Sequence, residues 1–422
     1  MTTSEATASR RDVLLCAGPF DGHVEPLLPV ASELIRQGHR VDILAGARYR
    51  DAVERTGASF EPLPGALDFG VQDLDETFPA RRALSGARRS LHDLEHLFIR
   101  PIGEQAAAID DILARHPVDV IVAESMFFGV VPLLSRAQSP RPRVVAWGTN
   151  PLSIPGRGRP PGGLGWHPAH NVPTRLRNAA ATSAVEHLVM GPSLQKVARA
   201  CVTRAGGVLD VFVLDWLTLV DDIVQTTVPG FEFPTDGPVH YIGPVSRSEG
   251  PLPDWWSDLD PSKPTILVTQ GSVELDLSHV VAPTLKALAD RPINVIVSAP
   301  GRPPSLPNNA YSATHLPYDA VFPHLSGFVT NGGYGGVGFA IRHGVPVVAV
   351  GKSQDKADVA ARVSWSGLGI GVVSQSISAA KVGASTAKIL DDPRYATRAR
   401  ELQQQASTLP GIAGAVEILT RT

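Results

Sequence analysis

The chain has few cysteines, no long hydrophobic run and no excess of charge of either sign. Its two cysteines, Cys16 and Cys201, lie far apart in 422 residues. This spacing excludes a disulfide framework or a cysteine-based metal cluster and favours a reducing compartment such as the cytoplasm. The 38 basic and 41 acidic residues leave a formal net charge of −3. This balance offers no electrostatic footprint for nucleic acid or for an anionic membrane surface.

Segments that would direct the chain into a membrane are also missing. The most apolar long stretch, residues 118–134, contains Asp119 and Glu124 and is interrupted by Pro132. The first ten residues are polar and lack the apolar centre of a signal peptide. We therefore expect a cytoplasmic protein without a membrane span.

What is present is a globular composition, with 43% hydrophobic and 19% charged residues, in a chain long enough for two domains. Short apolar runs alternate with amphipathic segments in two blocks, which predicts two parallel sheets covered by helices on both faces. The proline-rich stretch 226–264 is interpreted as the connection between the blocks. The expected strands are 13–17, 41–45, 118–123 and 143–146 in the first block and 265–269 and 293–298 in the second, with a helix at 25–37.

These blocks predict an α/β protein with two facing, doubly wound, Rossmann-like domains. We expect an N-terminal domain over residues 1–245, a C-terminal domain over 246–405, and a helix at 406–422 that packs back toward the first domain. The carboxyl ends of the two sheets would then face each other across a cleft. Such a cleft is the default ligand site in folds of this kind.

The most informative segment is FVTNGGYGGVGFAIRHGVPVVAVG, residues 328–351. An apolar run ends at Gly332, Gly333, Gly335 and Gly336, and then an amphipathic segment and a second apolar run follow. This order predicts a strand, a glycine loop, a helix and a strand. Backbone N–H groups of such a loop and the positive end of the helix suit a diphosphate. The same glycines would also permit a tight strand-to-helix turn in any α/β protein.

Two titratable residues are expected at the carboxyl edge of the first sheet. His23 follows the first strand, close to the start of a helix, where the helix dipole disfavours the charged imidazole and keeps it available as a base. Glu124 ends the run VDVIVAE, and beside His23 its carboxylate would orient the ring and stabilise the imidazolium. Each residue could instead cap a neighbouring helix.

Other motifs are weaker. The triplets Asp73-Leu74-Asp75 and Asp258-Leu259-Asp260 lie in loops without a preceding buried strand, so we expect no metal site there. The run GLGIG at 367–371 follows a helical segment and not a strand, so it does not meet the context of a dinucleotide-binding loop.

Four motifs in order resemble a known family over nearly the whole chain. They are GPFDGHVEP (18–26), YIGP (241–244), QGS (270–272) and TNGGYGGVGFAIRHGVPVV with a later DK (330–356). The pattern is similar to the inverting, nucleotide-sugar-dependent glycosyltransferases of GT-B architecture. In particular it resembles the bacterial natural-product branch of the UDP-glycosyltransferase family.

The resemblance implies a role for each matching position. His23 matches the general base of the family, and Glu124 stands where an aspartate usually completes the pair. The implied donor-binding residues are Gly271, Ser272, His315, Tyr318, Asn331, Gly332, Gly333, Gly335, Gly336, Phe339, Asp355 and Lys356. Among them Ser272 would contact the diphosphate, His315 would stack on the base, and Asp355 with Lys356 would read the sugar hydroxyls. No metal and no cofactor beyond a nucleoside diphosphate sugar is implied.

The chain departs from the family at two donor positions. Asn331 replaces a histidine whose ring bonds the diphosphate, although an amide can also donate a hydrogen bond. Phe339 replaces a glutamate or glutamine that engages the nucleoside sugar. Because phenylalanine cannot accept from a ribose hydroxyl, we favour a dTDP-deoxysugar donor over a UDP-sugar.

The expected reaction is transfer of a sugar to a small apolar natural product, as in antibiotic biosynthesis, in an acceptor site that includes Phe69, Phe78, Phe127 and Trp147. A donor-blind homologue that serves as an auxiliary, scaffold or metabolite-binding protein for a partner enzyme is the alternative. A sugar-nucleotide epimerase is a third possibility, which the long insertions after Gly65 and Pro151 disfavour. A homodimer or a partner transferase is compatible with the sequence, whereas a nucleic-acid partner is not expected.

Overall fold

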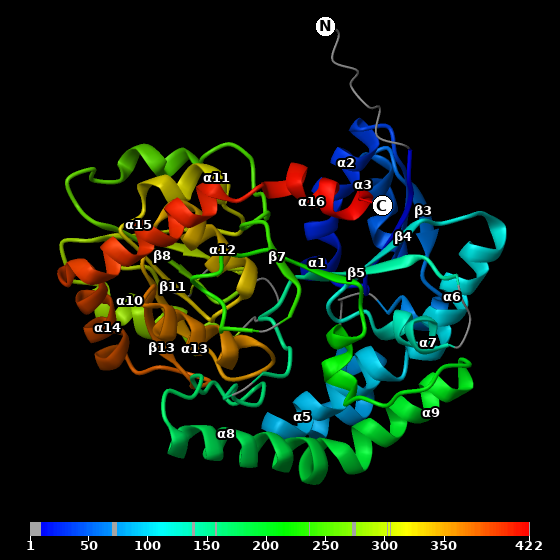
Figure 1. Ribbon diagram of the computed structural model, residues 1–422. Helices are drawn as coiled ribbons and strands as arrows, with labels where there is room; N and C mark the ends of the chain where they lie inside the picture. The colour runs from blue at the N-terminus through cyan, green and yellow to red at the C-terminus, as the bar shows by residue number, and fades with distance from the viewer. Residues whose placement is uncertain are drawn as a thin grey trace, which may run out of the picture.

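The chain folds into two α/β domains that lie side by side (Figure 1). The computed structural model describes residues 10–69, 74–136, 140–156, 158–235, 237–271, 276–301, 303 and 305–421. Ser272 and Asp73, which the sequence analysis singled out, fall outside these residues.

The described residues of the first domain form a seven-stranded sheet in the order β3-β2-β1-β4-β5-β6-β7. Every adjacent pair is parallel, for example β1 with β4 through Val13 and Val120. Its apolar strands are buried because helices cover both faces. The strands are β1 (Asp12–Cys16), β2 (Arg40–Ala45), β3 (Ser59–Pro62), β4 (Val120–Glu124), β5 (Arg143–Gly148), β6 (Asp222–Gln225) and β7 (Val239–Tyr241).

Helices of the first domain lie on the two faces of this sheet and in two long insertions. On one face α2 buries Val30, Ala31 and Leu34, and on the other α6 buries Ile109 and Ile112. The insertions carry α4 to α6 and the long arch of α8 and α9 (Figure 1). The helices are α1 (Asp21–Val24), α2 (Leu28–Arg36), α3 (Arg50–Glu54), α4 (Leu74–Thr77), α5 (Gly86–Asp93), α6 (Ile102–Arg115), α7 (Val131–Ser135), α8 (Val172–Ala184) and α9 (Lys196–Arg204).

The second domain repeats this architecture with six parallel strands in its described residues, in the order β10-β9-β8-β11-β12-β13. The strands are β8 (Thr265–Thr269), β9 (Asn294–Ser298), β10 (Ala310–Ala313), β11 (Gly327–Thr330), β12 (Val347–Val350) and β13 (Gly369–Val372). The helices are α10 (Val281–Leu288), α11 (Tyr318–Val321), α12 (Tyr334–His343), α13 (Lys356–Ser366), α14 (Ala379–Asp391) and α15 (Pro393–Thr408). The predicted fold class is therefore confirmed.

The last helix, α16 (Gly411–Thr420), returns to the first domain. It packs against α2, and Ala415, Val416 and Leu419 are buried in the same core cluster as the strands of the first sheet. Arg143 of β5 donates to the carbonyl of Ile418 at 2.8 Å. The C-terminal segment thus links the two domains, as Figure 1 shows.

The interpretation of residues 226–264 as a connection was wrong for part of that stretch. Val239–Tyr241 forms β7, which pairs with β6 as the edge strand of the first sheet. Prolines at 238 and 244 flank this strand, and an edge strand tolerates proline because one side of its backbone has no partner. The GLGIG run is the end of α13 and the start of β13, with Gly367 at a φ of 79° as the helix cap.

Candidate active site

His23 lies at the carboxyl edge of the first sheet, seven residues after β1 ends. It belongs to α1, a four-residue helix that begins after Phe20. The sequence predicted a helix that begins near Glu25, but helical backbone begins four residues earlier, at Asp21. His23 is therefore in the last turn of a short helix and not before the first turn of a long one.

Glu124, at the end of β4, contacts His23 directly. Its Oε2 is 2.6 Å from Nδ1 of His23, and the Glu124 side chain has no exposed surface. The same oxygen accepts the backbone N–H of Met126 at 3.0 Å, and Oε1 accepts the hydroxyls of Thr149 and Ser125 at 2.5 and 3.0 Å. Because the carboxylate is held by four donors, the imidazole that donates through Nδ1 has a fixed orientation. Its Nε2 is then left as the proton acceptor.

The pKa of His23 is raised, and its causes oppose each other. Burial lowers this pKa, but the charge of Glu124 and its hydrogen bond raise it, with a further contribution from Asp355. The expectation of a lowered pKa was wrong, because the charge and hydrogen bond of the Glu124 carboxylate outweigh burial. The pKa of Glu124 is lowered: burial raises it, and His23, Thr149 and Met126 outweigh burial.

Aromatic rings form a row that leads away from His23. The Phe20 and Phe98 rings lie 5.4 and 5.9 Å from the His23 ring. Phe69 packs on Phe20 at 5.9 Å, and Phe78 packs on Phe69 at 5.5 Å. Two of the predicted acceptor residues, Phe69 and Phe78, thus lie in this row. Phe20 was not predicted, although its position three residues before His23 was a usable signal.

The other two predicted acceptor residues lie in the core. Phe127 and Trp147 are each 0% exposed, and they belong to the two core clusters on opposite faces of the first sheet. Their rings present no surface to a ligand in this structure. The expectation for these two is therefore corrected: they support the sheet that carries Glu124, with Trp147 directly opposite Glu124 in the register of β4 and β5.

In the second domain, β8 and β11 end in two matching turns. Thr269 and Thr330 are register partners in the sheet. Each threonine hydroxyl accepts the N–H of a glycine two residues later, Gly271 or Gly332, at 3.2 Å. Both glycines have positive φ, 83° and 84°, which a residue with a Cβ adopts only with strain. The predicted strand, glycine loop and helix are thus present.

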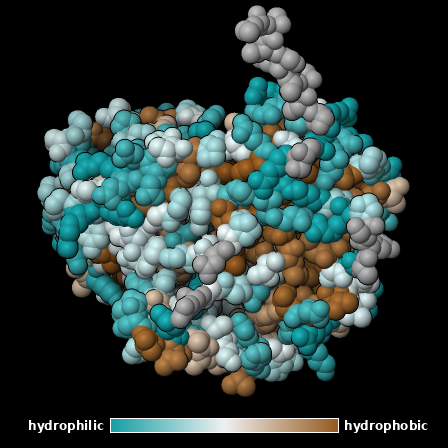
Figure 2. Space-filling view, in the orientation of Figure 1, coloured by the Kyte–Doolittle hydropathy of each residue, from teal (hydrophilic) through white to brown (hydrophobic). Residues whose placement is uncertain are grey.

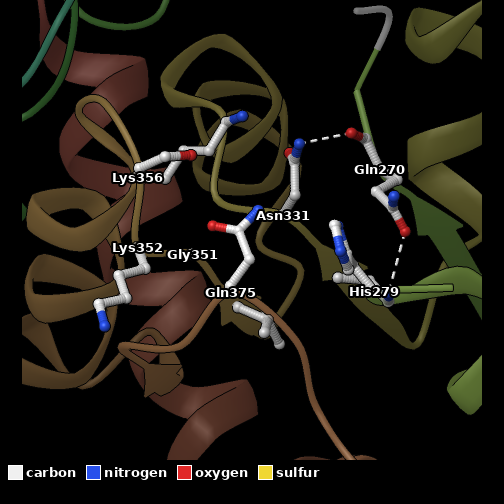
Figure 3. Close-up of a pocket in the computed structure, with 10 residues that line it drawn as sticks. Gln270, His279, Asn331, Gly351, Lys352, Lys356 and Gln375 are labelled. Carbon is white, nitrogen blue, oxygen red and sulfur yellow. Dashed lines mark hydrogen bonds between the residues drawn. The ribbon is translucent and has the colours of Figure 1, made fainter. Parts of the chain in front are cut away.

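A small pocket lies beside the start of the glycine loop, at Asn331. Gly333 precedes α12 without a side-chain cap, which leaves first-turn N–H groups of this helix available to an anion. Asn331 and Lys356, two of the residues predicted for the donor site, both line this pocket (Figure 3). The lining residues that sequence reasoning missed are Gln270, His279, Lys352, Ser353 and Gln375.

Asn331 differs from the expectation in what its amide does. Its Nδ2 donates to the main-chain carbonyl of Gln270, and the side chain is 9% exposed. Gln270 in turn accepts the N–H groups of Val280 and Val281 at 2.9 and 3.3 Å. The asparagine therefore ties together the loops after β8 and β11, so part of its donor capacity is used within the protein.

His315, Tyr318 and Phe339 lie apart from this pocket lining. His315 is exposed, whereas Phe339 is 6% exposed and packs against the Tyr318 ring at 5.3 Å and the Phe322 ring at 5.6 Å. Burial raises the pKa of Tyr318, and hydrogen bonds with Ser298 and Thr269 oppose that rise. Phe339 thus has a packing role in the structure, and its ring is not open to a nucleoside.

Asp355 brings the two sides of the site together. It is the residue before α13, and burial raises the pKa of its carboxyl to about 6. His23 of the first domain contributes to the Asp355 pKa, and Asp355 contributes to the His23 pKa, so the two groups interact across the domains. His23 therefore lies near Asp355, which is next to the pocket residue Lys356 in the sequence.

A buried polar network joins the domains beside the glycine loop. Gln225 donates to the Tyr334 hydroxyl at 2.6 Å, and that hydroxyl donates to Glu232 at 2.9 Å. Arg362 of α13 pairs with Glu232 at 2.7 Å and donates to the carbonyl of Leu152 at 3.0 Å. Since Tyr334 is the first residue of α12, this network fixes the start of that helix against the first domain.

No group of His, Cys, Asp and Glu suited to a metal ion is found among the described residues. In the same part of the chain, no helix is long and apolar enough to cross a bilayer.

Comparison with known proteins identifies the family. Residues 13–144 match the model of the glycosyltransferase family 28 N-terminal domain, and residues 284–421 match the erythromycin biosynthesis protein CIII-like C-terminal domain. The chain is 34% identical to 4'-demethylrebeccamycin synthase of Lentzea aerocolonigenes over 96% of this chain and 98% of that protein. It is 31% identical to UDP-glycosyltransferase 2 of Phaeomoniella chlamydospora, covering 95% of this chain and 93% of that one.

The glycosyltransferase VinC, solved in complex with dTDP, superimposes with a TM-score of 0.65 at 17% identity, covering 97% of this chain and 98% of that chain. The fold, the glycine loop facing a histidine and carboxylate pair, and these relatives agree. The chain belongs to the GT-B glycosyltransferases that include the UDP-glycosyltransferases and natural-product glycosyltransferases.

Proposed function

We propose that this glycosyltransferase moves a sugar from a dTDP-deoxysugar or a UDP-sugar to a nucleophilic group, in the first instance a hydroxyl, of a small apolar natural product, with inversion at the anomeric carbon. The observation that carries this proposal is the contact between His23 and Glu124 at 2.6 Å, on the side of the cleft that faces Asp355. A protein that only binds a metabolite does not need an imidazole that a fully buried carboxylate orients as a proton acceptor.

In the proposed reaction Nε2 of His23 takes the proton of the acceptor hydroxyl. The acceptor oxygen attacks the anomeric carbon from the face opposite the diphosphate. The bond from that carbon to the diphosphate oxygen breaks, and its electron pair leaves with the diphosphate. Glu124 stabilises the imidazolium, and the first turn of α12 faces the departing anion. Backbone donors and a helix end thus do the work for which other transferases use a metal.

The acceptor is proposed to be apolar because the row of Phe20, Phe69, Phe78 and Phe98 extends from the base. On the face that Figure 2 shows, hydrophobic residues gather on the first domain, whereas the second domain is mostly hydrophilic there. The relative named for demethylrebeccamycin synthesis supports a natural-product acceptor.

The donor proposal is tested by binding. Titration of the protein with dTDP and with UDP, followed by calorimetry and by the melting temperature, should show binding of at least one of them. Tighter binding of dTDP would support the deoxysugar proposal, which rests on the resemblance at Phe339 and on the complex of VinC with dTDP.

The reaction is tested by product formation. Incubation with a nucleotide sugar and a panel of flat, apolar hydroxyl compounds should release nucleoside diphosphate and yield a glycoside of inverted configuration by NMR. If a folded sample binds neither nucleotide, the donor-blind alternative is correct. Release of free sugar without any acceptor would favour an epimerase instead.

A further inference from the structure

We infer that Lys356 binds the diphosphate of the donor and stabilises the negative charge that develops on it as the sugar leaves. This assignment rests on the proposed function and changes the role that the resemblance gave to Lys356, which was to read sugar hydroxyls. In this assignment Lys356, at the start of α13, supplies the positive side-chain charge that contacts the diphosphate.

Packing holds the lysine against the glycine loop. Lys356 is the first residue of α13 and lines the same pocket as Asn331 and Gly351. A Cβ added at Gly351 would lie 2.4 Å from Cβ of Lys356, and one added at Gly332 would lie 3.7 Å from the same atom. Gly351 thus leaves the space that Cβ of Lys356 occupies, whereas Gly332 lies at ordinary contact distance from it.

The direction of the side chain differs from that of its neighbour. Figure 3 shows Lys356 reaching toward the side chain of Asn331, while Lys352 points away from it. Lys352 is exposed, whereas Lys356 is half-buried. Both lysines line the pocket, but of the two only Lys356 points toward the glycine loop.

The charge of Lys356 is poorly placed unless an anion binds. A helix carries partial positive charge at its N-terminus, so a lysine at the first position of α13 is unfavourable by itself. In the described part of the chain, no carboxylate lies within ion-pair distance of the Lys356 ammonium group, although the charge of the adjacent Asp355 acts on it at longer range. A diphosphate at this point would interact with the ammonium group and with the starts of α12 and α13 together. A lysine at a helix N-terminus, where positive charge is unfavourable, is typical of a position kept for function.

Asn331 cannot supply this charge. Its amide is neutral and donates to the carbonyl of Gln270. When the bond from the anomeric carbon to the diphosphate breaks, the electron pair stays on the diphosphate oxygen and its negative charge increases. A cation that is already in place stabilises that change without reorganisation. Lys356 is the pocket cation that points to the loop.

The test compares Lys356→Met and Lys356→Arg with Lys381→Met as the matched control, because Lys381 is an exposed lysine in the first turn of α14 and does not line the pocket. Binding of dTDP, UDP, thymidine and uridine is measured by calorimetry for each variant of the full chain. Lys356→Met should weaken diphosphate binding by about 10- to 100-fold, the usual effect of a charge-assisted hydrogen bond, and leave nucleoside binding unchanged. Lys356→Arg should recover most of the affinity, and Lys381→Met should change it less than about threefold.

A second readout separates binding from folding. Because Lys356 opposes the helix dipole, the melting temperature of ligand-free Lys356→Met should equal or exceed that of the parent protein. Unchanged diphosphate affinity in Lys356→Met overturns the inference, and so does an equal loss of nucleoside and nucleotide binding. If the parent protein itself binds no nucleoside diphosphate, the proposed function fails, which is a distinct result.

Discussion

At its carboxyl edge the first sheet carries a pair of interacting side chains, His23 and Glu124. The corresponding edge of the second sheet carries main-chain N–H groups. At the edge of the first sheet, Glu124 has all of its acceptor capacity used by Met126, Ser125, Thr149 and the His23 ring. At the edge of the second, two turns with glycine at positive φ and an uncapped helix present N–H groups, and Lys356 is the side-chain charge beside them.

This difference determines which substitutions each sheet edge tolerates. A proton acceptor works only in one orientation and one tautomer, so its partners must be fixed in number and place. An anion held by main-chain amides depends on the path of the backbone and less on any one side chain. The proposed diphosphate site therefore keeps its main-chain donors with Asn331 at the position where the resemblance places a histidine. The same asymmetry predicts which variants lose turnover and which lose binding.

The largest expected effect is on turnover, from His23→Ala. Removal of a general base lowers kcat by about 10²- to 10⁴-fold, while binding of dTDP or UDP, which depends on the other domain, should stay within about twofold. Steady-state kinetics with a hydroxyl acceptor and calorimetry with the nucleotide measure the two effects. A variant that keeps full rate would show that His23 is not the base.

Glu124→Gln should have the second largest effect on turnover, about 10- to 100-fold, because a neutral amide no longer stabilises the imidazolium. It should also change the pH dependence. The rate of the parent enzyme rises as the pH passes the raised pKa of His23, since only the neutral ring accepts a proton. Without the charge of Glu124, burial dominates and lowers that pKa, so the rising limb of the profile moves to lower pH.

The control for this variant is Glu124→Asp. It keeps the charge, so its limb should stay closer to that of the parent even if the shorter side chain lowers the rate. A rising limb that does not move in Glu124→Gln would contradict the electrostatic part of this account.

A third prediction compares alanine substitutions at two glycines of the loop that differ in backbone conformation. Gly332 has a φ of 84°, and a Cβ there would lie 3.3 Å from the Lys356 carbonyl oxygen. Gly332→Ala should therefore cost about 1–2 kcal/mol of stability and weaken nucleotide binding by about tenfold. Gly335 lies inside α12 with ordinary φ and its nearest neighbour at 3.6 Å, so Gly335→Ala should leave stability equal or higher. Equal losses in both variants would falsify this distinction.

Sequence patterns predicted the strands best. The run 265–269 matches β8 residue for residue, because buried parallel strands read as continuous apolar runs. The same continuity hides the direction of each side chain, so the aromatic residues at 127 and 147 could not be assigned to core or to pocket. The three-residue strand β7 was too short to stand out among prolines.

The site was predictable where a motif carried it. His23, Glu124 and the glycine loop follow from position at strand ends, and the structure brings the first two into contact. His279 and Gln375 come from loops whose place depends on how β8, β11 and β13 lie beside one another, which no local pattern records. The pKa direction of His23 depends on a contact between residues 101 positions apart.

The smallest effect on turnover is expected for Tyr334→Phe. This variant tests whether the catalytic pair of the first domain and the glycine loop of the second are positioned independently. The variant removes the hydroxyl between Gln225 and Glu232 but leaves the ion pair of Glu232 with Arg362. Loss of a buried hydrogen-bonding group costs about 1–3 kcal/mol, so the midpoint of urea unfolding should fall. The matched control is Tyr311→Phe, whose hydroxyl contacts a carbonyl at an exposed position and whose loss should change stability by less than about 0.5 kcal/mol.

Because the bond through Tyr334 fixes only the start of α12 relative to the first domain, kcat should fall less than about threefold, well below the loss in the base variants. A fall in kcat as large as that of Glu124→Gln would mean that the distance between the two edges, and not the chemistry of each, limits the reaction. The hydrogen-bond network that joins the two domains would then matter more for the rate than the difference between side-chain groups at the first sheet and main-chain groups at the second.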